Sequence, residues 1–279
     1  MISIRKVICT LYVTIAMCHS ASADAVEVRS PSGLMSVTFE VKDFEGTSAC
    51  PVYSVRYGNR IIVNESQLGL ELEDGRLGDG VTASVLSTGS HDATWKPVYG
   101  ERSAIRDRYS EAEIQLRQMD APHRIVTLAF RAYDEGVAFC YTIPKQAGMD
   151  RVTVAKEASE FRFPGDHAAW ATYSAQGRYE KVALGRIKPG CERPLVIQPA
   201  DEVYVAVAEA RCVDYARMKL SPLSGRANSL VSDLSSPVEA PLPLTTPWRV
   251  VMAADSPGRL LENNDIILNL NAPCAIADT

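Results

Sequence analysis

The chain has 279 residues, of which 46% are hydrophobic and 23% are charged, and its formal net charge is −5. This hydrophobic fraction is typical of a globular protein and excludes a disordered chain. The excess of acids argues against nucleic-acid binding and against docking on an anionic membrane, because both need a basic face.

The first 23 residues predict an export signal. Arg5 and Lys6 give a positive start, residues 7–18 form an apolar run, and residues 21–23 (Ala-Ser-Ala) have the small side chains of a cleavage site. The run is shorter than the ~20 residues of a membrane-spanning helix. We therefore expect a signal peptide over residues 1–23, cut after Ala23, and one mature domain over residues 24–279. The protein would be periplasmic or secreted and would have no membrane attachment after signal cleavage.

Five cysteines would remain in the mature chain: Cys50, Cys140, Cys191, Cys212 and Cys274. They are widely spaced and form no C-x-x-C pair, so the sequence predicts neither a disulfide scaffold nor a zinc site. Cys140 and Cys212 lie in strand-like runs, which predicts buried and unreactive thiols.

Apolar residues alternate with a period of two along most of the mature chain, which predicts β-strands. In chain order, the runs are residues 35–41, 68–72, 81–85, 126–130, 137–143, 203–207, 248–253 and 265–270. Asp134-Glu135-Gly136 separates two of these runs and predicts a hairpin. One short helix has clear start chemistry, because Ser256 can cap it and Pro257 suits its first position.

Many short strands and very few short helices predict an all-β fold of packed antiparallel sheets. The proline-rich stretch 237–247 could be a linker between domains. Strand patterns of the same type flank it on both sides, so we favour a crossing loop within one domain.

The common catalytic and metal-binding motifs are missing from the sequence. It contains no G-x-S-x-G, H-E-x-x-H, Walker or G-x-G-x-x-G motif, and no EF-hand spacing. Among His91, His123 and His167, no pair has the i, i+4 spacing of a helical metal site. Composition and pattern alone therefore indicate an exported all-β domain without indicating a reaction.

A series of segments adds more specific information. They are SPSGLMSVTFEV (30–41), PVYSVRYGNRIIV (51–63), LGLELED (68–74), TWKPVYGE (94–101), FRAYDEGVAFCY (130–141), EFRFPGDHAAW (160–170), VDYARMKL (213–220), TPWRVVMAAD (246–255) and ILNLNAPCAIADT (267–279). In this order they resemble the N-terminal domain of glycoside hydrolase family 97, a family of α-glucosidases and α-galactosidases. The resemblance covers about residues 26–279.

The resemblance implies a β-supersandwich of the galactose-mutarotase-like type. Family members continue from the last of these segments into a (β/α)8 barrel that carries the catalytic carboxylates, and this chain stops at Thr279, where that barrel would begin. Glycosidic cleavage needs two carboxyl groups that flank the bond. We therefore expect no catalytic residue in this chain, which would be a carbohydrate-binding or accessory domain of an exported α-glycosidase. Its expected partners are an α-linked oligosaccharide and a catalytic (β/α)8 barrel, in cis or in trans.

The resemblance also implies site residues. In the family, a glutamate from the loop after the Gly-Asp-His…Trp segment helps to bind a calcium ion at the shared active site. The loop here is residues 171–187, and Glu180 is its only acid, so Glu180 is the expected ligand, although Gln176 could occupy that position instead. One carboxylate alone is a poor calcium site, because the ion takes about six to eight oxygen ligands.

In the segment before this loop, Asp166, His167 and Trp170 are the expected substrate-binding residues. Two other functions remain open. The chain could be a standalone carbohydrate-binding protein, by analogy of fold alone. It could also be an aldose-epimerase-type enzyme that uses histidine and glutamate as acid and base, which ranks last because its histidines do not match the motifs of that family.

Overall fold

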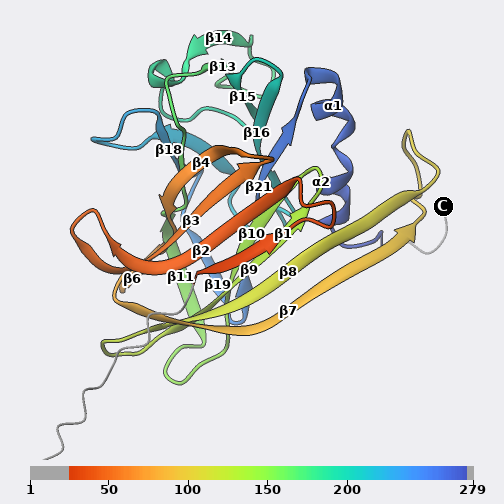
Figure 1. Cartoon of the computed structure of the whole chain (residues 1–279). Helices are drawn as coiled ribbons and strands as arrows, with labels where there is room; N and C mark the ends of the chain where they lie inside the picture. Colours follow the sequence, from red (N-terminus) through yellow and green to blue (C-terminus); the bar gives the residue numbers. More distant parts are fainter. Residues whose placement is uncertain (1–24, 275–279) are drawn as a thin grey trace, which may run out of the picture.

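The computed structural model describes residues 25–274, which form an all-β fold of three antiparallel sheets with two short α-helices (Figure 1). This architecture confirms the all-β, antiparallel fold that the alternating sequence pattern predicts. The predicted signal peptide over residues 1–23 lies outside the described residues. Within them, no helix combines the length and apolar character that crossing a bilayer requires.

The largest sheet has ten strands in the described part of the chain. They are β7 (Val81–Trp95), β8 (Ile105–Gln118), β9 (Ile125–Tyr133), β10 (Gly136–Ile143), β13 (Ala168–Ala171), β14 (Glu180–Ala183), β15 (Leu195–Ala200), β16 (Val203–Ala210), β20 (Leu244–Thr245) and β21 (Trp248–Ala254). Their order is β14-β13-β15-β16-β21-β10-β9-β8-β7, and β20 pairs with β10. Tyr133 pairs with Gly136 across the turn between β9 and β10, which confirms the predicted hairpin.

Two smaller sheets complete the fold. The seven-stranded sheet contains β1 (Val26–Arg29), β2 (Met35–Phe44), β3 (Thr47–Tyr57), β4 (Arg60–Gln67), β12 (Glu160–Arg162), β17 (Met218–Pro222) and β18 (Ser229–Leu234). The four-stranded sheet contains β5 (Leu70–Leu72), β6 (Gly75–Leu77), β11 (Arg151–Glu157) and β19 (Val238–Pro241). The proline-rich stretch 237–247 carries β19 and β20, so it crosses from the four-stranded sheet to the ten-stranded sheet.

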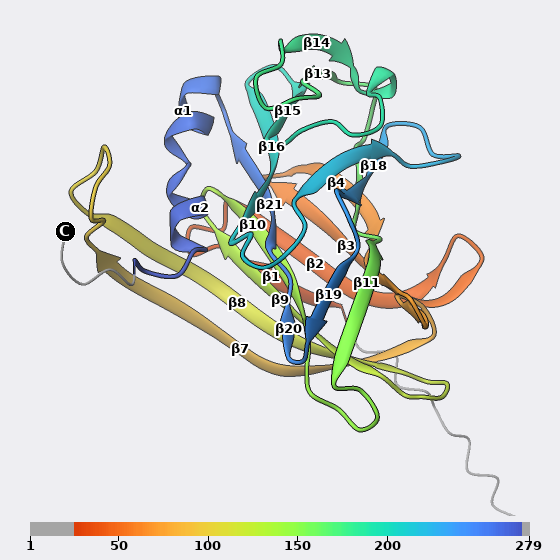
Figure 2. The ribbon, with the colours of Figure 1, turned by 180° about the vertical axis from the view of Figure 1, so that it is seen from behind.

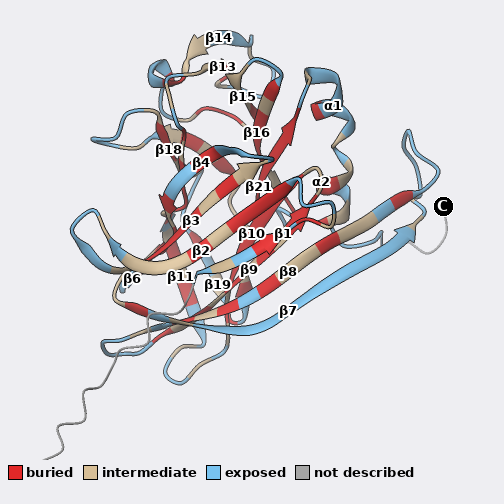
Figure 3. Cartoon of the chain, in the orientation of Figure 1, coloured by how far each residue is buried: buried red, intermediate tan, exposed pale blue. Residues whose placement is uncertain are grey.

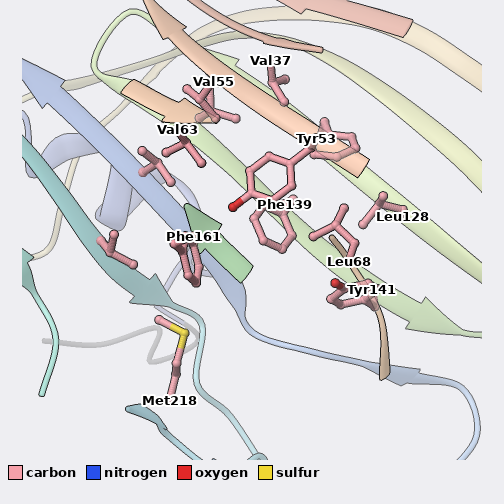
Figure 4. Close-up of a cluster of buried hydrophobic side chains, with 14 of the residues drawn as sticks. Val37, Tyr53, Val55, Val63, Leu68, Leu128, Phe139, Tyr141, Phe161 and Met218 are labelled. Carbon is pink, nitrogen blue, oxygen red and sulfur yellow. The ribbon is translucent and has the colours of Figure 1, made fainter. Parts of the chain in front are cut away.

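The main core lies where the inner faces of the sheets meet. Alternate residues of β10, including Phe139 and Tyr141, point into it, because successive side chains of a strand face opposite sides. The Tyr53 ring from β3 lies 5.1 Å from the Phe139 ring, centroid to centroid, and joins the seven-stranded sheet to the ten-stranded sheet. Figure 4 shows these rings with Phe161 from β12 among surrounding aliphatic side chains.

The outer face of the ten-stranded sheet is covered in part by α1 (Pro257–Glu262) and α2 (Asp265–Asn269). Leu260, Ile266 and Leu270 from this helical region pack with alanines and with larger side chains of the sheet, among them Tyr133 and Trp248, in a second buried cluster. The Ser256 hydroxyl accepts a hydrogen bond from the Arg259 amide, 3.3 Å away, and Pro257 occupies the first helical turn. Both features match the predicted helix start.

The sequence prediction was wrong for residues 265–270, which form α2 and one following residue instead of a strand. Ile266 and Leu270 lie four residues apart and are both buried, whereas Leu268 between them is 40% exposed. This spacing places the buried pair on one face of a helix. The short apolar run fits both periods, and packing against the sheet selects the helical one.

The prediction for the cysteines was right for Cys140 and wrong for Cys212. Cys140 lies in β10 and is buried, whereas Cys212 is exposed. β16 ends at Ala210, so Cys212 falls in the loop that follows it. The Arg211 amide donates a hydrogen bond to the Asn271 side chain there, at 3.1 Å, and the chain leaves the sheet.

Strands β7 and β8 extend beyond β9 as a two-stranded arm, because β9 pairs with β8 only from Tyr109 onward. β7 is exposed along most of its length (Figure 3). The arm is attached to α2: Trp95 Nε1 donates to Asn269 Oδ1 at 2.8 Å, and Asn269 Nδ2 donates to the Arg106 carbonyl at 2.9 Å. The view from behind shows α2 beside β8 (Figure 2).

Candidate functional site

An open groove of about 670 Å³ lies on the outer face of the ten-stranded sheet, between the helices α1 and α2 and the loop that joins β13 to β14. Its floor, its helical wall, its loop wall and its charged end come from different elements. The floor consists of Val196, Ala206, Ala208 and Met252, and the helical wall consists of Pro257, Leu260, Leu261, Asn264 and Ile267. The loop wall consists of Thr172, Ser174, Ala175 and Tyr179, and the charged end consists of Glu192, Arg193, Pro194, Glu209 and Arg217.

The sequence of β16 explains why a groove forms here. Valines of this strand point into the core, and the small Ala206 and Ala208 point outward. Because alanine side chains are short, they leave space above the sheet between the helices and the opposite loop. The alternation of inward valines and outward alanines in β16 therefore accounts for the groove.

One end of the groove belongs to a chain of ion pairs that begins in the core. Arg249 on β21 pairs with Glu157 and with Glu209. Arg193 then connects Glu209 to Glu192, at 2.9 Å and 3.3 Å respectively. Glu192 also pairs with Arg217 at 2.6 Å and with Lys219 at 3.2 Å. Buried charges are tolerated when each one is paired in this way.

Within this network of ion pairs, the acidic side chains lie deeper than most of the basic ones. The side chains of Glu157, Glu209 and Glu192 are 0%, 2% and 5% exposed. Those of Arg193, Lys219 and Arg217 are 20%, 26% and 42% exposed. The surface at this end of the groove therefore presents positive charge, although the chain as a whole is acidic.

The innermost base, Arg249, is fully buried. Burial by itself would lower the pKa of Arg249, but the adjacent carboxylates of Glu157 and Glu209 outweigh it and hold this pKa above its usual value. Arg249 therefore stays charged and anchors the network to the core.

Trp170, one of the predicted substrate-binding residues, stands next to this groove. It pairs with Val196 of the groove floor across the β13–β15 ladder. On its other side it pairs with Lys181 of β14, whose Nζ lies 5.0 Å from the centre of the indole ring. A cation over an indole face is a favourable contact.

Asp166 and His167 are not among the residues that line the groove. Asp166 Oδ1 accepts a hydrogen bond from the Gly185 amide at 2.7 Å, where the short 3-10 helix η1 (Leu184–Arg186) follows β14. His167 lines a separate cavity of about 240 Å³ with Ile62 and Val203 among its walls. Burial lowers the pKa of His167, and the nearby Asp166 opposes this effect only in part.

Glu180, the predicted calcium ligand, is exposed at the start of β14. It pairs with Ala171, whereas its neighbour Lys181 pairs with Trp170, so Glu180 and Trp170 point to opposite faces of the sheet. Residues 25–274 contain no group of three or more His, Cys, Asp or Glu side chains that could hold a metal ion.

The sequence interpretation did not single out Glu192, Arg193, Glu209, Arg217 or Arg249. One signal was available: Arg249 and Glu209 interrupt continuous apolar strand runs, WRVVMA and VAVAEA. A charge in such a run must find a partner in the interior. Their partners lie far away in the chain, so spacing alone does not reveal the network.

The fold and the groove define an all-β sandwich domain with an open surface site. The family model for the Glycosyl-hydrolase 97 N-terminal domain matches residues 28–273, and the chain belongs to this family. The match confirms the resemblance that the sequence segments indicate.

A curated relative is the probable retaining alpha-galactosidase of Streptomyces bingchenggensis (strain BCW-1), 28% identical over 225 residues. The alignment covers 76% of this chain and 33% of that relative. A solved structure, a glycoside hydrolase family 97 enzyme from Pseudoalteromonas sp. strain K8 in complex with acarbose, is 27% identical, with a TM-score of 0.82. It covers 91% of this chain and 39% of the enzyme.

A variant of the Pseudoalteromonas enzyme has been solved in complex with panose, with the same identity of 27% and a TM-score of 0.82. A beta-arabinopyranosidase has the same fold, with a TM-score of 0.73 at 23% identity, over 82% of this chain and 40% of that one. The chain thus spans 33% to 40% of the length of these relatives.

Proposed function

We propose that this chain acts as the accessory N-terminal domain of an exported α-glycosidase. The family match over residues 28–273 is the observation that carries the proposal. Because the chain spans 33% to 39% of the matched relatives, we assign the catalytic carboxylates to the remaining region of such an enzyme, a (β/α)8 barrel in cis or in trans. The apolar run at residues 7–18 supports export to the periplasm or the medium.

The outer face of the ten-stranded sheet is the surface that we assign to the catalytic region and its saccharide. Leu261 and Tyr179, at the rims of the groove, are 78% and 58% exposed. Exposed apolar side chains around a groove are typical of a surface that meets a partner or a ligand. The expected ligand is an α-linked oligosaccharide, since two structures of the Pseudoalteromonas enzyme are described in complex with acarbose and with panose.

Calcium enters this proposal only as a shared ion. Glu180 would give one ligand, and the others would come from the catalytic region, because a calcium ion takes about six to eight oxygens. Glu180 is exposed and points to the face opposite to Trp170, so such an ion would lie at the β14 edge of the sheet and not in the groove. The described chain alone should therefore bind calcium weakly.

The test is an assay of the purified mature chain, residues 24–279, with p-nitrophenyl α-glucoside and p-nitrophenyl α-galactoside. A complete family 97 enzyme serves as the positive control. We expect no hydrolysis by the unaided chain, because cleavage needs two carboxyl groups that flank the bond. Hydrolysis of either substrate that stays with the chain through further purification would overturn the accessory role.

A second candidate, a standalone carbohydrate-binding protein, is favoured by the groove itself. Its volume of about 670 Å³ lies within the range of small-molecule pockets. Calorimetric titration of the mature chain with maltotriose separates the two functions. Strong binding without any catalytic partner would favour the standalone role.

A further inference from the structure

Strand β7 leaves a long edge of the largest sheet without a partner strand in the described part of the chain. It ends the strand order and pairs with β8 alone, and Figure 1 shows it along the border of the molecule. β7 has 15 residues, whereas β14, at the other end of this sheet, has 4. The strands that end the other two sheets have 3 to 5 residues. A free edge presents unpaired amide and carbonyl groups and is a template for another strand.

β7 lacks the side chains that normally keep such an edge in solvent. Natural edge strands are protected by short length, by lysine and other charges, or by proline. Residues 81–95 contain no Lys, Arg, Glu or Pro, and Asp92 is their single acid. The charges lie one strand further in, on β8, which carries Arg106, Asp107, Arg108, Glu111, Glu113 and Arg117. This distribution is the reverse of the one that protects an edge, and it suits a strand that becomes covered.

The edge is regular from Ser87 to Trp95. These residues pair in unbroken register with residues 105–113 of β8, and the register shift of this ladder comes before them, between Val85 and Ser87. At about 3.3 Å per residue, the regular stretch is about 30 Å long. The hydrogen bonds of Asn269 hold the far end of the arm in place. Because the strand is already ordered, little conformational entropy is lost when a second strand docks on it.

The composition of this edge favours a second copy of the same chain as its partner. Most of residues 87–95 are Ser, Thr, Gly or Ala, and such small side chains form no pockets that would select the side chains of a foreign peptide. The one acid is already neutralised, since Arg106 donates to the two carboxylate oxygens of Asp92 at 2.8 Å and 2.7 Å. Two copies therefore meet without like-charge repulsion, and their Ser and Thr side chains can form stabilising cross-strand pairs.

From these observations we propose that the domain forms a symmetric dimer in which residues 87–95 of one copy pair antiparallel with the same residues of a second copy. A two-fold axis pairs this strand with itself, so a single contact closes the assembly at two copies. One pair of strands is a small interface, and we therefore expect a weak dimer. The proposal does not depend on the accessory role, because β7 lies at the opposite end of the sheet from the groove strands β15 and β16.

Sedimentation velocity of the mature chain measures the oligomeric state. From about 1 µM to about 200 µM we expect monomers that convert to dimers and no larger species, as for a weak interface. Added salt should change the Kd by less than about twofold, because the contact uses no charge pair that mobile ions screen. Hydrogen–deuterium exchange locates the contact. Alternate amides of residues 87–95 should exchange at least about fivefold more slowly at the high concentration, because antiparallel pairing bonds them, and amides of β14 should not change.

Lysine variants test the edge directly. Ser90 is exposed, and Ser90→Lys should raise the Kd of the dimer at least about tenfold, because lysines of both copies would then lie on one face of the joined strands and repel each other. Asn64→Lys is the matched control and should leave the Kd unchanged. Asn64 is also exposed, but it lies in β4, which is paired on both sides. Both variants should keep the unfolding temperature of the parent within a few degrees at a concentration where the parent is monomeric.

Several outcomes would overturn the proposal. A monomer over the whole concentration range excludes the dimer, and a dimer that Ser90→Lys does not weaken excludes β7 as its contact. Slower exchange at α1 and α2 instead of β7 would show that another surface joins the two copies. Assemblies that grow beyond two copies would show that the contact is not symmetric. None of these outcomes bears on the accessory role, which is tested separately by hydrolysis of aryl glycosides.

Discussion

Arg249 and Glu157 form an ion pair in which neither side chain is exposed to solvent. Arg249 Nε lies 2.6 Å from Glu157 Oε1, and a terminal nitrogen of Arg249 lies 2.5 Å from Glu157 Oε2. Glu157 is the last residue of β11 in the four-stranded sheet, and Arg249 lies in β21 of the ten-stranded sheet. The pair therefore joins two sheets through the interior.

Arg249→Met should destabilise the fold by about 3–5 kcal/mol, because it leaves the buried carboxylate of Glu157 without its basic partner and leaves Glu209 with Arg193 alone. Urea denaturation of the mature chain at neutral pH measures this loss. Arg226→Met, at an exposed pair, should change the free energy of unfolding by less than about 0.5 kcal/mol. Similar losses of unfolding free energy in the two variants would contradict the expectation that the buried pair contributes more than the exposed one.

Gly136 and Gly258 should respond in opposite ways to alanine. A Cβ at Gly136 would lie 2.6 Å from the Val251 carbonyl oxygen and 3.0 Å from Met252 Cα, both backbone atoms that cannot move aside cheaply. Gly136→Ala should therefore cost about 1–3 kcal/mol. A Cβ at Gly258, in α1, would meet nothing within 4 Å, so Gly258→Ala should stabilise by up to about 1 kcal/mol. Thermal unfolding of the two variants checks both signs.

Asp134 gives a prediction for acid pH. Its Oδ1 accepts hydrogen bonds from the Ser32 amide at 2.9 Å and from the Ser32 hydroxyl at 2.6 Å. Burial would raise the pKa of Asp134, but these bonds favour the charged form and the net pKa is lowered. A carboxyl with a lower pKa in the folded state stabilises the fold above its unfolded pKa, about 3.9, and this contribution is lost as the pH falls through the folded pKa.

Asp134→Asn should therefore lower the free energy of unfolding at pH 6 and have a smaller effect near pH 3. Urea denaturation at the two pH values measures the difference. Ser32→Ala removes the hydroxyl donor and keeps the amide donor, so its effect should have the same sign and a smaller size. An effect of Asp134→Asn that does not change with pH would contradict this account.

Much of the fold could be predicted from local pattern. Residues 137–143 and 248–253 alternate cleanly, and both form strands of the largest sheet. The short run at residues 265–270 fits a strand and a helix equally well, so periodicity could not assign it. Only contact with the outer face of the sheet, through Ile266 and Leu270, decides its conformation.

The site was less predictable than the fold, because it depends on register and on distant partners. Trp170 and Glu180 are ten residues apart in one segment, and their separation onto opposite faces follows only from the pairing of β13 with β14. Arg249 and Glu157 are 92 residues apart, and no local pattern relates them. The sequence indicated the segment around Trp170, which borders the groove, but it did not indicate the network of ion pairs at the end of the groove.

Asn269 should control the position of the β7–β8 arm, since its side chain bonds both to Trp95 and to the Arg106 carbonyl. Asn269→Ala removes two hydrogen bonds, each of which contributes about 0.5–1.5 kcal/mol. We expect faster hydrogen–deuterium exchange over residues 93–107 and a small loss of overall stability. Asn271→Ala is the matched control, because it loses its bond to Arg211 and should speed exchange there instead. Unchanged exchange in the arm of the Asn269 variant would show that the arm is held by other contacts.

Thiol labelling tests the placement of the cysteines in the mature chain. Cys50, Cys140 and Cys191 are at most 3% exposed, whereas Cys212 and Cys274 are exposed. Burial also raises the pKa of Cys140 to about 12, which keeps its thiol protonated at neutral pH. We expect a maleimide reagent to label two thiols in the native protein and all five after denaturation, as counted by intact mass. Cys212→Ser should reduce the native count by one, and Cys140→Ser should leave it unchanged. A native count of three or more would show that a strand of the buried sheet opens readily, because the thiolate must reach solvent in order to react.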